Sequence, residues 1–89
     1  MLTTAQALAL LQSGAPVTYD VLDEVFLAFG FSSELELPNT TWYRHPRYGR
    51  CGDFRAKPLY DFSTLSREQV RIVLGMIGCV RAHQELERG

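Results

Sequence analysis

Residues 31–45 read FSSELELPNTTWYRH, and this stretch decides the fold class. From Phe31 to Leu37 every second residue shares one face, which is the period of a β-strand. Pro38-Asn39 is a turn signal, and Thr40 to His45 is again rich in residues that favour strands. The stretch therefore predicts an antiparallel hairpin, with the apolar face of its first strand in the core.

Helical and strand patterns flank this hairpin on both sides. Residues 3–14 predict a short helix, and residues 18–30 predict a second helix that ends at Gly30. Residues 54–59 predict a third strand, with Pro58 at its end or on an edge. Irregular chain is expected over residues 60–65.

A last helix is expected from Ser66, because Ser66 and Gln69 have the spacing of a capping box. Within this helix Gly75 suggests a close approach to another backbone. The helix either ends at Gly78 or continues through residues 79–87.

These elements predict one α+β domain over residues 1–89, a three-stranded antiparallel sheet with helices packed on one face (α-β-β-β-α). Residues 1–16 form an extra N-terminal helix.

The composition, 46% hydrophobic and 21% charged, is that of an ordinary globular domain. No apolar run approaches the roughly 18 residues that cross a bilayer, and no secretory signal is visible. We therefore expect a cytoplasmic chain that makes no membrane contact, with Cys51 and Cys79 as free thiols.

The formal charge of the whole chain is −1, but it is distributed unevenly. Residues 1–43 carry −5, residues 44–57 carry +4, and the remainder carries 0. Eight of the nine bases are Arg, whose planar guanidinium suits phosphate and carboxylate. An anion-binding site is therefore expected on residues 44–57.

Three strings carry a family resemblance. They are YDVL at 19–22 leading to FGF at 29–31, WYRHP at 42–46, and LSREQVRIVL at 65–74 with Gly78 beyond it. In this order they resemble the HicA family of toxins from prokaryotic toxin–antitoxin systems. The resemblance covers residues 19–79 and leaves residues 1–16 outside.

The resemblance implies a fold like that of double-stranded-RNA-binding domains and a metal-independent endoribonuclease that an antitoxin protein neutralises. The family's catalytic histidine lies in a Gly-Ser-His motif before the second strand. Aligned on His45-Pro46, that position falls on Thr40, whose hydroxyl cannot act as a base near neutral pH. RNA cleavage does not follow for this chain. His45 is the one remaining candidate base, or a contact to phosphate, and the alternative is a residue at the strand end whose imidazole hydrogen-bonds locally before Pro46.

The basic residues of the hairpin, interleaved with aromatic residues, are candidates for RNA binding. The alternative is a solvated hairpin with ordinary surface charge. The candidate RNA-binding residues are Arg44, Arg47, Arg50, Arg55, Lys57 and Arg71.

A Cys₂His₂ set of zinc-ligand types is also present: His45, Cys51, Cys79 and His83. Cys79 and His83 are four residues apart, which suits one face of a helix. No Cys-x₂-Cys knuckle accompanies them, so we expect no metal and no cofactor.

Two functions remain open. One is a HicA-like RNA-binding protein that works with an antitoxin, and the other is a non-catalytic interaction module that retains the fold. In the second, a protein partner binds through the sheet edge or the extra N-terminal segment. Separately, the leucines at 8, 10 and 11 are expected to cover that edge or to form a homodimer contact. An accessible His45 beside Arg44, Arg55 and Lys57 on one exposed face favours RNA, whereas a buried His45 and dispersed arginines favour the module.

Overall fold

The computed structural model describes residues 1–57 and 63–88 and confirms the α+β class. The predicted strand end at 58–59 and the irregular chain at 60–62 lie outside the described residues. The elements are α1 (Thr4–Gln12), α2 (Tyr19–Ala28), β1 (Ser32–Glu36), β2 (Thr40–Arg44), the short 3₁₀ turn η1 (Gly49–Cys51), β3 (Asp53–Ala56) and α3 (Arg67–Arg88).

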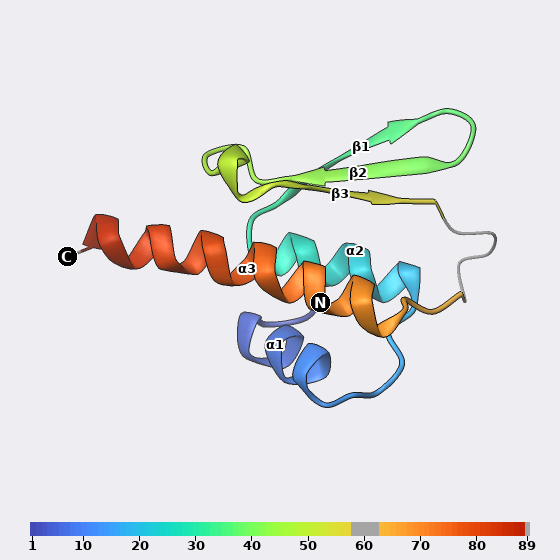
Figure 1. Ribbon diagram of the computed structural model, residues 1–89, viewed down its shortest axis with the longest axis horizontal. Coiled ribbons are helices and arrows are strands. Elements are labelled where there is room, and N and C mark those ends of the chain that lie inside the picture. The colour runs from blue at the N-terminus through green and yellow to red at the C-terminus, as the bar shows by residue number, and fades with distance from the viewer. Residues whose placement is uncertain (58–62, 89) are drawn as a thin grey trace.

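The elements form three layers (Figure 1). The sheet, in the order β1-β2-β3, is the first layer, and α2 and α3 lie against one of its faces. The helix α1 packs on α2 and α3 from the side away from the sheet. The long α3 extends past the sheet, so its C-terminal half lies below η1.

The ring of Phe26 lies at the centre of the core. Phe26 is fully buried, and its ring stacks on Tyr43 of β2 with centroids 4.5 Å apart. It also contacts Phe31, just before β1, at 4.8 Å and Phe54 of β3 at 5.9 Å. Offset and tilted ring pairs of this kind contribute about 0.5–1.5 kcal/mol each beyond the area they bury. One side chain of α2 therefore holds all three strand segments.

The strands pair antiparallel as the sequence predicts. Glu34 lies opposite Trp42, which lies opposite Arg55, and Arg44 lies opposite Asp53. The predicted core face of β1 is wrong, however, because Leu35 and Leu37 are 66% and 81% exposed. The inner faces of β2 and β3 are buried under the helices, whereas every residue of the edge strand β1 is exposed.

The helix α1 does not cover the sheet edge, which corrects one of the two roles expected for its leucines. Thr3 and Gln6 form a reciprocal capping box that begins the helix. Ala7 and Leu11 are then buried against α2 and α3. The apolar face of α1 therefore packs against the other two helices and not against the sheet edge.

The helix α3 begins at the predicted capping box, in which Ser66 and Gln69 exchange hydrogen bonds of 2.8 and 3.1 Å. It continues through Gly75 and Gly78 to Arg88, so the tail extends the helix. The close approach predicted at Gly75 is wrong, since a Cβ there would meet nothing within 4 Å. The close approach occurs at Gly30 instead, where a Cβ would lie 3.3 Å from His45 Nε2.

Within the described residues, no helix is both long enough and apolar enough to cross a bilayer.

The open space at the two α3 glycines makes a test of the helix. We expect Gly75→Ala and Gly78→Ala each to raise the free energy of unfolding by about 0.5–1 kcal/mol, measured by urea denaturation, because alanine has less backbone entropy to lose. Gly14→Ala is the matched control. A Cβ there also meets nothing, but φ is +79°, so a loss of about 1 kcal/mol is expected. Destabilisation by the α3 substitutions would contradict a continuous helix.

Candidate interaction surface

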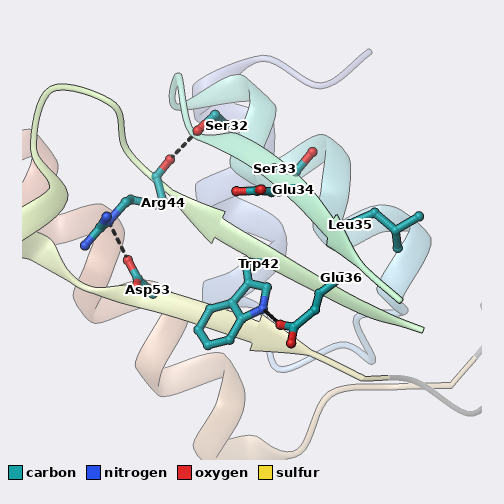
Figure 2. Close-up of a pocket in the computed structure, with 8 residues that line it drawn as sticks. All are labelled: Ser32, Ser33, Glu34, Leu35, Glu36, Trp42, Arg44 and Asp53. Carbon is teal, nitrogen blue, oxygen red and sulfur yellow. Dashed lines mark hydrogen bonds and ion pairs between the residues drawn. The ribbon is translucent and has the colours of Figure 1, made fainter. Parts of the chain in front are cut away.

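The outer face of the sheet, turned away from the helices, is a polar surface (Figure 2). A shallow depression of about 420 Å³ runs along it beside β1. The Arg44 guanidinium Nε lies 2.8 Å from an Asp53 carboxylate oxygen. Trp42 donates its indole N–H to Glu36, and the Arg55 guanidinium lies 5.0 Å from the Trp42 ring centroid. The cations of this face are thus already matched with an acid or an aromatic ring.

The charge of the outer face does not favour phosphate. By the strand register, Glu34, Glu36 and Asp53 lie on it together with Arg44 and Arg55. Three carboxylates therefore accompany two guanidinium groups. A polyanion would have to displace internal partners and approach neighbouring negative charge, which weakens binding.

Of the other predicted RNA-binding residues, Arg47, Arg50 and Arg71 lie outside the sheet and Lys57 follows its last strand. Arg47 pairs with Glu87 at the far end of α3, with nitrogen and oxygen 3.0 Å apart. Arg50 is in η1, Lys57 follows β3, and Arg71 is exposed on α3, in the layer below the sheet. These three form no ion pair with any described residue. By the strand register, the structure brings Arg44 and Arg55 to a common face. Lys57 lies one residue beyond β3, and its expected place on the face of Arg55 stays a prediction.

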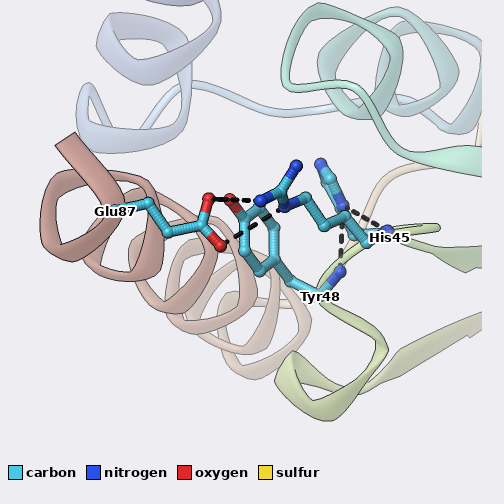
Figure 3. Close-up of polar contacts among 4 residues, drawn as sticks. His45, Tyr48 and Glu87 are labelled. Atoms are coloured by element: carbon cyan, nitrogen blue, oxygen red, sulfur yellow. Dashed lines mark hydrogen bonds and ion pairs between the residues drawn. The ribbon is translucent and has the colours of Figure 1, made fainter.

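His45 is buried at the end of β2, with 7% of its surface exposed. Its Nδ1 accepts hydrogen bonds from the backbone N–H groups of Arg47 and Tyr48, 3.1 and 3.2 Å away (Figure 3). Since Nδ1 is the acceptor, the neutral ring carries its proton on Nε2. Burial lowers the pKa of His45 below its ordinary value. This imidazole organises the loop that follows β2 and offers no free Nδ1 to a substrate.

Thr40, at the family's catalytic position, begins β2 opposite Glu36 and is buried. A threonine hydroxyl does not gain or lose a proton near neutral pH, so position 40 provides no general acid or base. Neither candidate position for RNA cleavage therefore presents an accessible general base.

The loop after β2 is fastened to the C-terminal half of α3 by contacts that the sequence did not suggest. Tyr48 donates its hydroxyl proton to Glu87, 2.6 Å away (Figure 3). The Tyr48 ring also stacks on His83, with centroids 5.7 Å apart. The hydrogen bond raises the pKa of Tyr48 and lowers the pKa of Glu87. Separations of about 40 residues place these contacts beyond any local pattern.

Cys51 and Cys79 form a disulfide between η1 and α3, so the expectation of free thiols is wrong. The two residues are 28 apart in sequence but have Cα atoms 5.6 Å apart, because α3 passes directly below η1. The cytoplasmic expectation used free thiols as an argument and stays a prediction without that support. Of the four metal-ligand types, Cys51, Cys79 and His83 come together, and His45 does not join them.

The edge strand β1 is the feature of this surface that sequence reasoning misjudged. Figure 2 shows Leu35 pointing to the opposite side of β1 from Glu34 and Glu36. Within the described residues, β1 pairs only with β2, so its other edge is open. The alternation of the sequence was the correct signal for two faces, but it could not show that both faces are exposed.

No protein-family model, no curated protein and no solved structure matches this chain. The HicA resemblance therefore depends on the three sequence strings and the order of the elements alone.

The buried acceptor role of His45 can be tested by substitution. We expect His45→Ala to lower the free energy of unfolding by about 1–3 kcal/mol, because two loop N–H groups lose their acceptor. His45→Asn keeps an acceptor oxygen close to the Nδ1 position and should lose less. Urea denaturation measures both. Equal losses in the two variants would contradict the acceptor role.

The lowered pKa of His45 predicts a pH dependence. Below its ordinary value of about 6.5, the unfolded chain binds a proton that the folded chain does not, so stability falls as pH falls. The free energy of unfolding is measured at about pH 7.5 and about pH 5.5, on either side of that pKa. We expect the difference between the two values to be smaller in His45→Asn than in the wild type. The same pH slope in both proteins would show that His45 does not titrate differently on folding.

Proposed function

We propose that this chain is a non-catalytic protein-interaction module that binds an extended segment of a partner along the open edge of β1. The observation that carries the proposal is that β1 is fully exposed and open on one side within the described chain. An open edge offers unpaired backbone N–H and C=O groups to another strand. Strand addition of this kind is a common mode of peptide recognition.

The two faces of β1 specify the chemistry of the partner segment. On one face, Leu35 and the adjacent Leu37 are largely exposed, so an added strand buries apolar side chains beside them. On the other face lie Glu34 and Glu36, and Glu34 forms no ion pair with a described residue. The best partner is therefore a segment in which apolar residues alternate with Lys or Arg.

Self-association through this edge is disfavoured by the same residues. A two-fold antiparallel pairing of β1 with β1 of a second copy would bring Glu34 and Glu36 of both chains onto one face. Like charges in neighbouring cross-strand positions destabilise a sheet. The acidic row thus discourages homodimers while it favours a basic partner, and the HicA resemblance makes an antitoxin protein the first partner to examine.

The RNA-cleaving alternative has less support. His45 is buried with Nδ1 occupied, and Thr40 provides no base. Arg44 and Arg55 share the outer face of the sheet but are already matched with Asp53 and Trp42, and Arg47 is paired with Glu87 on α3. These arrangements favour the interaction module over a ribonuclease.

A designed peptide tests the proposed edge. The probe is a short peptide that alternates valine with lysine, and binding is followed by backbone amide shifts in ¹⁵N-labelled protein. We expect the largest shifts in residues 32–36. Leu35→Lys and Glu34→Lys should each weaken binding by at least about tenfold, a change of about 1.4 kcal/mol, because each removes one face of the contact.

Matched controls separate the edge from general surface charge. Leu86→Lys and Glu85→Lys introduce the same changes at exposed positions on α3 and should leave binding unchanged. A peptide alternating valine with glutamate should not bind. Equal effects of the control variants, or shifts away from β1, would exclude the edge as the site. Low-salt RNA binding that Arg44→Gln and Arg55→Gln abolish would favour the RNA alternative instead.

A further inference from the structure

Three metal-ligand side chains meet where η1 contacts α3. The ligand atoms of Cys51, Cys79 and His83 all lie within 4.8 Å of one another, and all three residues are half-buried. Cys79 and His83 lie four residues apart on α3, which places them on one face of the helix. Cys51 comes from η1, directly above that face. The cluster is separate from the β1 edge and uses none of its residues.

We propose that the reduced protein binds one zinc ion through Cys51, Cys79 and His83. Two thiolates and an imidazole are ligands that zinc favours, in tetrahedral geometry. With zinc–ligand bonds of about 2.0–2.3 Å, tetrahedral ligand atoms lie roughly 3.5–3.8 Å apart. The two sulfurs are bonded to each other in the oxidised protein and move apart to about that separation after reduction, while the imidazole already lies within 4.8 Å of both. The three residues leave the fourth zinc position to water.

The contacts around the cluster keep it assembled without the disulfide. Tyr48 and Arg47 both bind Glu87, so the loop before η1 stays fastened to α3 when the sulfur–sulfur bond is broken. The Tyr48 ring stacks on His83 at an interplanar angle of 10° and so orients the imidazole. Orientation of a ligating histidine by its neighbours increases metal affinity.

Metal and disulfide exclude each other, since both use the two sulfur atoms. A water-soluble phosphine cleaves the disulfide with one water molecule, giving two thiols and the phosphine oxide. Zinc then displaces the two thiol protons as the sulfurs become ligands. The oxidised protein should bind no zinc at this position, so the site depends on the redox state.

Cobalt(II) substitution tests the site, because thiolate-ligated tetrahedral cobalt absorbs in the near ultraviolet and the visible. Phosphine-reduced wild-type protein is titrated with cobalt under nitrogen, and zinc is then added. We expect one cobalt per chain with both absorption features, which zinc removes. The oxidised wild type and the reduced Cys51→Ser/Cys79→Ser protein should show neither feature. His83→Gln should bind cobalt at least about tenfold more weakly. Replacing a residue that only orients a metal ligand already lowers metal affinity by about that factor.

His45→Asn is the matched control, because it removes the chain's other histidine but keeps an acceptor oxygen for the loop that carries Tyr48. It should bind cobalt as the wild type does. Circular dichroism monitors folding throughout. A reduced wild type that takes up no more cobalt than the double serine variant overturns the proposal, as does unchanged affinity in His83→Gln. A reduced chain that unfolds and does not refold with zinc also overturns it, whereas zinc-dependent refolding supports it.

Discussion

The packing of one phenylalanine ring determines which parts of this small fold are covered. Phe26 reaches from α2 to Phe31, Tyr43 and Phe54 and so fixes the sheet over the helices. Tyr43 adds a hydrogen bond from its hydroxyl to Asp23 of α2, 3.1 Å away. The ring contacts hold β2 and β3 against the helical layer, and the hydrogen bond fastens β2 further. The edge strand is held through Phe31 and its pairing with β2, and its own side chains extend beyond that layer.

This placement separates the molecule into two regions of different character. At one side the exposed β1 presents leucines on one face and glutamates on the other. At the far end of α3, aromatic stacking, ion pairing and a disulfide fasten the loop that precedes β3. The first region has the features of recognition, and the second has the features of a constrained side-chain cluster. The proposed peptide-binding edge and the proposed zinc site use different residues, so a test of one does not decide the other.

Local patterns predicted the elements well and predicted their surroundings less well. The alternation at 31–37, the turn at Pro38-Asn39 and the capping pair Ser66 and Gln69 all depend on neighbouring residues, and all are confirmed. Alternation shows which residues of β1 share a face, but the position of α2 and α3 decides whether that face is buried. The disulfide and the Tyr48–Glu87 bond join distant segments, so no local rule could reveal them. The hydrogen bonds of His45 are local, and they are the structural role that its place at the strand end allows.

The narrow space between Gly30 and His45 has a consequence for how this sequence can diverge. A Cβ at position 30 would lie 3.3 Å from His45 Nε2, a tight contact, and Gly30 has a φ of 81° that other residues rarely adopt. A lineage that loses His45 loses the steric reason for glycine but keeps the conformational one. Drift at the two positions is therefore unequal. Position 45 can change while Gly30 remains, whereas a change at position 30 requires a shift of the residue at 45 and a rebuilt connection from α2 to β1.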